Sequence, residues 1–495
     1  MTLTQPDHPL VVGLDIGTTS IAAVAVSTSG RIVASAGEPH GAAVRDLPDG
    51  YAEQSPDAVL SAVWRCLKSI ANEADGRNII AVGVTGQMHS TVLLDDQQAA
   101  IGNIVTWQDR RSVTGPGGHL LASLQDAVPA GIRSRPGCRP SAGFMATTIY
   151  ALRQLGQWPS ECRHVSFVAD WVVRELTNHP AVSDISHAAS SGMFDLLQQT
   201  WCPDIVELTG LPPTALPEVQ PSGSVVSTLS RAAAEQLGCA PEVVVCNAVG
   251  DNQASVIAAL PDNPNAVLIN IGTGGQIVWR SESPCSSAMT EIRTLPTDDD
   301  RPGEIADGTM IVGAGICGGD AIAWWNHTVR SWAQALGVTL SESDVWKLAG
   351  KTETSALRCQ PFFRGTRQSP ELRGAITGID WHNLSPANLL NSIYEGIADA
   401  MFAVWDDAGK APSGVPSSVQ MSGNAARRHP GLVRAVSNRF GVTATVTPFA
   451  EEAAVGAAML AGVRIGHWPS LASARDQVHR VKGSTAPPDE PLSDK

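Results

Sequence analysis

A short motif occurs twice in this chain, and its repetition constrains the fold more than any other feature. "VVGLDIGTTSIAAVAV" at residues 11–26 is an apolar run that is interrupted by Asp15, Gly17 and a row of hydroxyl side chains. "NAVLINIGTGGQIVW" at residues 265–279 repeats the pattern, with Asn270 in the position of Asp15, 255 residues further on. Aliphatic runs on both sides of glycine predict two strands joined by a tight turn. A spacing of about half the chain predicts two domains of related architecture.

The residues of the first turn indicate a phosphate site. The carboxylate of Asp15 loses hydration among aliphatic neighbours and needs a cation or hydrogen-bond donors. Gly17, Thr18, Thr19 and Ser20 offer backbone N–H groups and three hydroxyl groups in one short arc. That combination suits a phosphate group, with Asp15 facing its metal ion. The alternative is an ordinary β-hairpin whose Asp and Thr side chains satisfy the turn.

Length, charge and cysteine usage narrow the class of protein. A chain of 495 residues exceeds one typical core and predicts two or more domains. A formal charge of −14 without a basic cluster argues against a nucleic-acid partner. The first residues lack a signal-peptide pattern and no apolar run is long enough for a bilayer, so we expect a cytoplasmic protein without a membrane partner. The nine scattered cysteines predict reduced thiols rather than a zinc site.

Strand and helix patterns alternate along the chain, which predicts an α/β protein. Residues 79–95 indicate strand, loop and strand, and residues 243–249 indicate a buried strand. A helix is expected to begin at Asp251, and another over residues 385–408. The polar, proline-rich chain from residue 467 onwards is expected to be poorly ordered.

Eight motifs in order resemble the FGGY family of carbohydrate kinases, and the paired hairpins resemble the actin-like ATPase fold. They are "GLDIGTTS" (13–20), "GVTGQMHS" (83–90), "TWQDRR" (106–111), "GDNQAS" (250–255), "NIGTGGQ" (270–276), "PFFRGTRQSPELRG" (361–374), "MSGNAAR" (421–427) and "EEAAVGAAML" (451–460). The resemblance implies an α/β fold of two actin-like ATPase (ribonuclease H-like) domains with a cleft between them. Residues 1–256 would form the sugar-side domain, residues 257–466 the domain with the second hairpin and the adenosine site, and residues 467–495 a disordered tail.

By this resemblance Asp251 is the general base of the reaction. A sugar hydroxyl is a poor nucleophile until a nearby carboxylate can accept its proton, and the phosphoryl group then transfers. The alternative is that Asp251 only caps its helix, for about 1 kcal/mol of stability.

The resemblance also implies ATP and Mg²⁺. Asp15 would face the metal ion through water, as Mg²⁺ usually keeps several waters. The matching phosphate and nucleotide positions are Gly17, Thr18, Thr19, Gly272, Thr273, Gly274, Gln276, Gly423 and Asn424. For the loop at Gly423, an ordinary strand-to-helix turn is the alternative. "LAGKT" at 348–352 is no Walker motif, because Val345 stands where its first glycine is required.

The sugar side of the resemblance comprises Gln87, Met88, His89, Trp107 and Asp109, together with the base Asp251. Met88–His89 resembles the ketose-binding pair of xylulokinases, and "VTWQD" resembles sedoheptulokinases. We therefore expect phosphorylation of a primary hydroxyl of a ketose such as sedoheptulose. A xylulokinase or another pentulose or polyol kinase is the alternative, and the resemblance also allows for a homodimer.

Three positions depart from the family pattern. Ser90 stands where glycine is common, Thr366 replaces an acidic residue, and Arg110 adds a second arginine after Asp109. These departures concern the identity of the substrate more than the type of reaction.

Two other classes of protein remain as rivals. Gly313, Gly315 and Gly318 match the G-x-G-x-x-G spacing of a dinucleotide-binding oxidoreductase. A non-catalytic sugar-binding protein or a chaperone-like ATPase could share the fold. Asp251 argues against the non-catalytic protein, and the sugar-side motifs argue against the chaperone.

Overall fold

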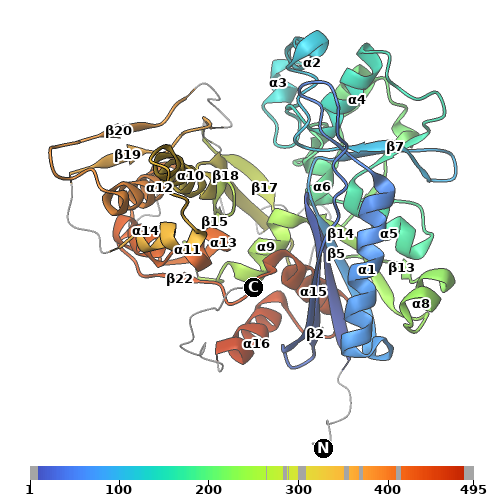
Figure 1. Ribbon diagram of the computed structural model, residues 1–495. Coiled ribbons are helices and arrows are strands. Elements are labelled where there is room, and N and C mark those ends of the chain that lie inside the picture. The colour runs from blue at the N-terminus through green and yellow to red at the C-terminus, as the bar shows by residue number, and fades with distance from the viewer. Residues whose placement is uncertain are drawn as a thin grey trace, which may run out of the picture. The chain divides into compact units, whose positions relative to one another are not determined.

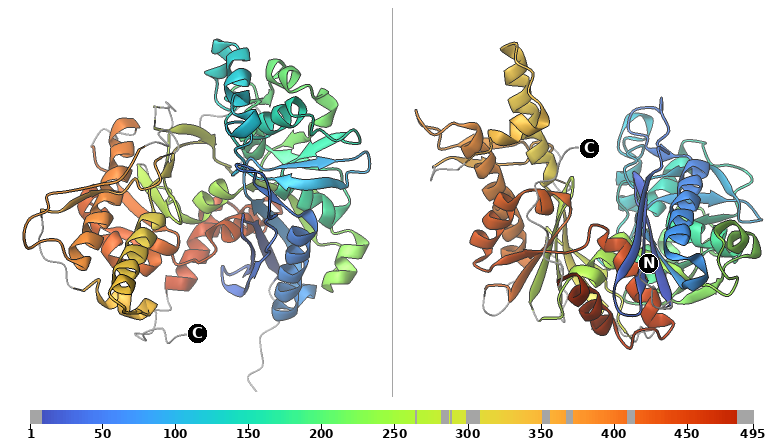
Figure 2. Two further views of the ribbon diagram at one scale, coloured as in Figure 1. Left: turned by 45° about the horizontal axis from the view of Figure 1, so that its top comes forward. Right: turned by 60° about the horizontal axis from the view of Figure 1, so that its bottom comes forward.

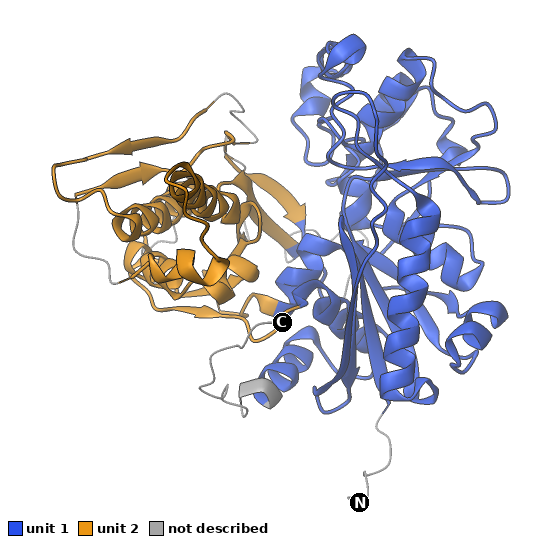
Figure 3. Cartoon of the chain, viewed as in Figure 1, with its two compact units in different colours: residues 1–258, 294–308, 451–495 blue, residues 259–293, 309–450 orange. Residues whose placement is uncertain are grey.

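The computed structural model describes residues 9–263, 265–281, 287, 289–298, 308–350, 356–366, 372–408 and 414–483. The chain forms two compact units, coloured separately in Figure 3. Unit 1 comprises residues 1–258, 294–308 and 451–495, and unit 2 comprises residues 259–293 and 309–450. Within the described ranges, no helix combines the length and the apolar character that a membrane span requires.

The centre of unit 1 is a six-stranded sheet in the order β13–β14–β5–β1–β2–β3 (Figure 1). Its strands are β1 (Leu10–Ile16), β2 (Ser20–Ser27), β3 (Ile32–Pro39), β5 (Ile79–Gly86), β13 (Val225–Thr228) and β14 (Val244–Gly250). The predicted hairpin is confirmed, because β1 and β2 pair antiparallel, while β5 runs parallel to β1 and β14 parallel to β5. Side chains alternate across a strand, so Leu10, Val12 and Leu14 enter one core while Gly13 faces the opposite side of the sheet.

Helices and a smaller sheet complete unit 1. The smaller sheet has the order β4–β7–β6–β8, and strand β4 supplies Gln54. Helices α2 to α4 gather at one end of the unit (Figure 2). The remaining strands are β4 (Glu53–Gln54), β6 (Thr91–Leu94), β7 (Ala100–Val105), β8 (His164–Ser166), β9 (Val182–Asp184), β10 (Phe194–Asp195), β11 (Thr200–Trp201) and β12 (Glu218–Gln220). The helices are α1 (Pro56–Ala74), α2 (Leu120–Ala127), α3 (Ala130–Arg133), α4 (Met145–Gln154), α5 (Val168–Thr177), α6 (Ile185–Ala189), α7 (Pro203–Thr209), α8 (Arg231–Leu237), α9 (Asp251–Ala259), α15 (Glu452–Arg464) and α16 (Leu471–Gly483).

Helix α15 packs with unit 1, although it lies within the residues 257–466 predicted as the second domain. It packs on β1 and β5, where the strands carry Gly13 and Gly83. A Cβ atom on Gly13 would collide with the carbonyl oxygen of Ala454, and one on Gly83 with that of Ala457. The alanine and glycine run of α15 therefore permits a close approach of helix to sheet, which joins the end of the chain to its beginning.

The prediction of a poorly ordered chain from residue 467 is wrong for α16. Leu471, Ala474 and Val478 of this helix are buried, at a helical spacing that lies within a polar stretch. Trp468 is also buried, and Arg475 donates from Nε to the carbonyl of Ile257 at 2.8 Å. The polar composition hid this apolar stripe, while residues 484–495 lie outside the described ranges.

Unit 2 repeats the strand pattern of unit 1. Its sheet has the order β17–β18–β16–β15–β21–β22. β15 pairs antiparallel with β16 and parallel with β21, just as β1 pairs with β2 and β5, and β18 lies outside β16 as β3 lies outside β2. The predicted duplication of architecture is therefore confirmed. The strands are β15 (Ala266–Ile271), β16 (Gly275–Arg280), β17 (Glu291–Thr294), β18 (Thr309–Ile316), β19 (Arg358–Gln360), β20 (Ala375–Thr377), β21 (Ser418–Ser422) and β22 (Ala444–Val446), and the helices are α10 (Gly319–Ala335), α11 (Glu342–Lys347), α12 (Pro386–Ala408), α13 (Asn424–Arg428) and α14 (Pro430–Phe440).

Candidate active site

Side chains from elsewhere in unit 1 form hydrogen bonds with the backbone carbonyls of the turn between β1 and β2. Nε2 of His40 lies 3.3 Å from the carbonyl oxygen of Gly17, and Nε2 of Gln54 donates to that of Thr18 at 2.6 Å. Nδ1 of His40 accepts the N–H of Ala42 at 3.0 Å, so the proton of the neutral ring is on Nε2 and points to Gly17. Burial lowers the pKa of His40, which keeps the ring neutral at pH 7. Neither His40 nor Gln54 was predicted from the sequence as part of this turn.

Three carboxylates interact electrostatically near the end of β1. Oδ1 of Asp15 is buried and has no hydrogen-bond partner among the described residues. Burial raises the pKa of Asp15 well above its usual value, and the charges of Asp251 and Glu451 raise it further. Glu451 immediately precedes α15, and sequence reasoning missed it because it lies more than four hundred residues from Asp15. Such a cluster favours a cation nearby.

Asp251 is the first residue of α9, as the sequence predicts, and it follows directly on β14. Its Oδ1 accepts the N–H of Asn252 at 2.7 Å. The N–H of Gly250 donates to Oγ of Ser186 at 2.8 Å, and that hydroxyl contacts the two carboxylate oxygens of Asp184 at 2.7 and 2.8 Å. The strand end that carries Asp251 is thus anchored to a buried polar network.

The loop that carries the predicted sugar residues lies beside this strand end. His89 adopts a left-handed backbone with φ of 71°, which is uncommon outside glycine and typical of functional loops. Its ring stacks on Phe144 at 4.0 Å, and its Nδ1 lies 2.7 Å from the carbonyl oxygen of Ser190. Sδ of Met88 lies 3.0 Å from the place that a Cβ of Gly250 would take. The structure therefore brings Met88 next to the residue that precedes Asp251.

Two further predicted sugar residues differ in exposure. Trp107 is 45% exposed, and its indole N–H donates to Oγ1 of Thr18 at 3.0 Å. Gln87 is only 1% exposed, with its amide bonded to Ser90 on one side and to Gln54 on the other, at 3.0 Å each. Trp107 can present an aromatic face to a ligand. Both polar ends of the Gln87 side chain are bonded within the protein, and its direct contact with a sugar stays a prediction.

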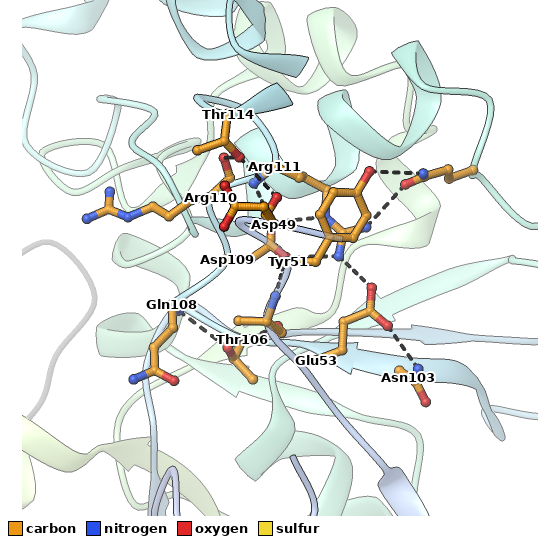
Figure 4. A network of polar contacts seen from close by, with 12 residues as sticks. Asp49, Tyr51, Glu53, Asn103, Thr106, Gln108, Asp109, Arg110, Arg111 and Thr114 are labelled. Carbon is orange, nitrogen blue, oxygen red and sulfur yellow. Dashed lines mark hydrogen bonds and ion pairs between the residues drawn. The ribbon is translucent and has the colours of Figure 1, made fainter. Parts of the chain in front are cut away.

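Asp109, another of the predicted sugar residues, lies in a network of polar contacts within the protein (Figure 4). Its Oδ1 accepts from N and Nε of Arg111, and its Oδ2 accepts from Nη2 of Arg111 and from N of Ala52, all at 2.9–3.0 Å. Arg111 also pairs with Glu53 at 2.5 Å and lies over the ring of Tyr51 at 4.1 Å. The pKa of Arg111 is raised above its usual value. Burial acts to lower it, but the hydrogen bonds and charges of Asp109 and Glu53 outweigh this effect. Both carboxylate oxygens of Asp109 thus accept hydrogen bonds from groups of the protein.

In unit 2 the turn between β15 and β16 is held from the start of α10. The N–H of Gly319 donates to the carbonyl of Gly272 at 2.9 Å, and that of Asp320 to the carbonyl of Thr273 at 2.8 Å. Thr273 and Gly274 are exposed at the tip of the turn. The second hairpin therefore resembles the first, because hydrogen bonds hold its backbone carbonyls while the tip of its turn stays exposed.

The remaining predicted nucleotide residues gather at the same end of β15. Gly423 joins β21 to α13 with φ of 88°, and a Cβ there would collide with the carbonyl oxygen of Ile271 and lie 3.0 Å from Oδ1 of Asn270. Gln276 of β16 pairs with Asn270 in the sheet register. Asn424 is exposed at the start of α13. Gly423 thus does form a strand-to-helix turn, and that turn lies against the second hairpin.

The glycines of the rival dinucleotide motif have packing roles. A Cβ on Gly313 would lie 2.5 Å from Cγ1 of Val404, and a Cβ on Gly318 would lie 2.5 Å from the backbone of Gly274. Close packing between β18, α12 and the second hairpin thus accounts for these two glycines without a dinucleotide. Residues 351–352 of "LAGKT" and residues 367–371 of the motif at 361–374 lie outside the described ranges.

Comparison with known proteins agrees with this architecture. The models for the N-terminal and C-terminal domains of the FGGY family of carbohydrate kinases match residues 10–258 and 267–465. Sedoheptulokinase from Homo sapiens is 28% identical over 488 residues, which cover 92% of this chain and 97% of that protein. Glycerol kinase from Saccharolobus islandicus is 26% identical over 485 residues, covering 94% and 90%. The crystal structure of xylulose kinase from Rhodospirillum rubrum superposes with a TM-score of 0.79 at 23% identity, covering 96% and 98% of the two chains.

The chain therefore belongs to the FGGY family of carbohydrate kinases. It has the two-domain actin-like ATPase fold of that family, and it is an enzyme that phosphorylates a carbohydrate.

Proposed function

We propose that this kinase transfers the γ-phosphoryl group of ATP to a primary hydroxyl of a ketose, with sedoheptulose as the first candidate. One observation carries the proposal: Asp251 stands at an anchored strand end and interacts with Asp15, whose buried oxygen has no partner in the described part of the chain. The relatives named sedoheptulokinase and xylulose kinase support a ketose as the acceptor.

Asp251 is proposed as the general base. A carboxylate that accepts the hydroxyl proton makes the sugar oxygen a competent nucleophile during phosphoryl transfer. Its neighbour Met88 and the stacked ring of His89 come from the sugar loop, so the proton acceptor and the proposed sugar residues share one region of unit 1. The exposed face of Trp107 would contact the C–H groups of the sugar.

The residues at the end of β1 fit a magnesium ion. Oxygen ligands are those that Mg²⁺ prefers, and the unpartnered Oδ1 of Asp15 is such a ligand. No group of three or more acidic, histidine or cysteine side chains among the described residues could hold a metal together, so water would complete the coordination. When bound, the ion would neutralise charge on the phosphates.

The two hairpins are proposed to bind the phosphates and the adenosine. Thr18 and Thr19 in unit 1 and Thr273 in unit 2 offer hydroxyl and amide donors at turn tips, where anion-binding backbone is common. Gly423 and Asn424 would approach the adenosine, since a residue without a side chain lets backbone and ligand come close.

A pentulose or a polyol is the second candidate acceptor. The relatives named for xylulose and glycerol match over nearly the whole chain, and their similarity to this protein is comparable to that of the sedoheptulokinase. The pocket depth that separates a seven-carbon from a five-carbon ketose is not set by the matched motifs.

ADP release measured over a panel of sedoheptulose, xylulose, ribulose, gluconate and glycerol tests the proposal. We expect a ketose to give the highest kcat/KM, with sedoheptulose first. A protein that releases ADP fastest with glycerol or gluconate would contradict the ketose assignment. No stimulation by any member would contradict the whole proposal.

A further inference from the structure

A buried chain of hydrogen bonds joins the sugar loop to the first phosphate hairpin. Oγ of Ser90 donates to Oε1 of Gln87 at 3.0 Å, Nε2 of Gln87 donates to Oε1 of Gln54 at 3.0 Å, and Nε2 of Gln54 donates to the carbonyl of Thr18 at 2.6 Å. The three side chains belong to residues that are 0%, 1% and 3% exposed. We call this chain of bonds the Ser90–Gln87–Gln54 relay.

The relay has only one possible direction. A backbone carbonyl can only accept, so Gln54 must turn its NH₂ group towards Thr18 and its oxygen towards Gln87. Gln87 must then donate to Gln54, and its own oxygen faces Ser90, whose hydroxyl has to be the donor. The orientation of both amides therefore follows from the bonding pattern, and Ser90 completes it.

The end of the relay sets the orientation of a peptide group in the hairpin. In a trans peptide the C=O and the N–H point to opposite sides. Because Gln54 grips the carbonyl of Thr18, the N–H of Thr19 points away from Gln54. His40 acts in the same way on the carbonyl of Gly17 and turns the N–H of Thr18. Trp107 holds the Thr18 side chain through Oγ1.

We infer that the Ser90–Gln87–Gln54 relay orients the backbone donors of the first hairpin for the phosphates of the nucleotide, with Gln54 as a positioning residue. The inference rests on the proposed use of ATP. Gln87 and Ser90 flank the sugar-loop residues Met88 and His89, so the relay also makes the sugar loop and the phosphate hairpin one connected polar structure. Ser90 is the residue that departs from the glycine common in the family, and it supplies the first donor.

Calorimetric binding of a non-hydrolysable ATP analogue with Mg²⁺ tests the inference without turnover. In Gln54→Glu a carboxylate still accepts from Gln87 but repels the Thr18 carbonyl, so the Kd should rise about tenfold. Ser90→Gly removes the first donor and should raise the Kd about threefold. Gln125→Glu is the matched control, because Nε2 of Gln125 also donates to a backbone carbonyl, that of Pro140 at 2.8 Å, away from the hairpin.

The controls separate positioning from stability. Thermal unfolding of each variant without ligand reports the structural cost, and Gln125→Glu should keep the nucleotide Kd within about twofold of wild type. A folded Gln54→Glu with a wild-type Kd would overturn the inference. If Gln54→Glu does not fold, Ser90→Gly decides, and an unchanged Kd there overturns it. A wild-type protein that does not bind the analogue contradicts the proposed function itself, and the inference falls with it.

Discussion

Asp109, predicted from its motif to contact the sugar, forms a buried ion pair with Arg111. Both of its oxygens are used by Arg111 and by the backbone of Ala52. The motif match alone could not show this, because the decisive partners, Ala52 and Glu53, lie more than fifty residues earlier in the chain. The same network explains why Arg111 follows Asp109 so closely: a side chain two residues on can reach the carboxylate with two donors.

We predict that Arg111→Met destabilises the protein by about 3 kcal/mol, because the buried carboxylate of Asp109 and the partly buried carboxylate of Glu53 lose their cation. The measurement is urea unfolding followed by tryptophan fluorescence. Arg110→Met is the matched control, since the Arg110 side chain points away from the network (Figure 4) and is exposed. Equal loss of stability in the two variants would contradict the role given to Arg111.

At the scale of elements, His429 ties the junction of α13 and α14 to the rest of unit 2. Its Nδ1 lies 3.1 Å from the hydroxyl of Tyr394 on α12, and its ring lies 4.8 Å from that of Trp346 on α11. Burial, and then the charge of Arg428, lowers the pKa of His429 from 6.5 to about 4. The packing of α11 and α12 on the junction of α13 and α14 therefore depends on a neutral imidazole.

This shift gives a pH dependence of known sign. Between pH 6.5 and about 4 the unfolded chain binds a proton at His429 that the folded chain does not, so stability falls as the pH falls through this window. We predict that His429→Gln, which stays neutral, loses less thermal stability than wild type between pH 7 and pH 5. Melting temperatures at the two pH values check this. An equal or larger loss in the variant would contradict the assignment.

At the scale of the whole molecule, the duplicated hairpin predicted the architecture correctly. Glycines and aliphatic runs are local signals, and they placed the strand pairs β1–β2 and β15–β16. Packing between distant segments leaves no local signal. That is why the packing of α15 on unit 1 was not predicted and why α16 was missed, although each has a buried apolar face.

The candidate site likewise combines residues that local motifs predict with residues that only tertiary contacts bring there. Asp15, Thr18 and Asp251 lie where local motifs place them, at the turn of a hairpin and at the start of a helix. Glu451 and His40 reach this region only through tertiary contacts. The residues proposed to bind the ligand are thus partly predictable from motifs, whereas the residues that orient them required the structure.

The most direct test of the central claim is the turnover number of Asp251→Asn with saturating ATP and the best sugar of the panel. We predict a loss of about 10²- to 10⁴-fold in kcat with nucleotide affinity retained, because only proton acceptance is removed. Asp57→Asn is the control, as Asp57 is an exposed acidic residue in the first turn of α1. It should leave kcat within about twofold of wild type. An Asp251→Asn enzyme that keeps wild-type turnover would contradict the assignment of Asp251 as the base.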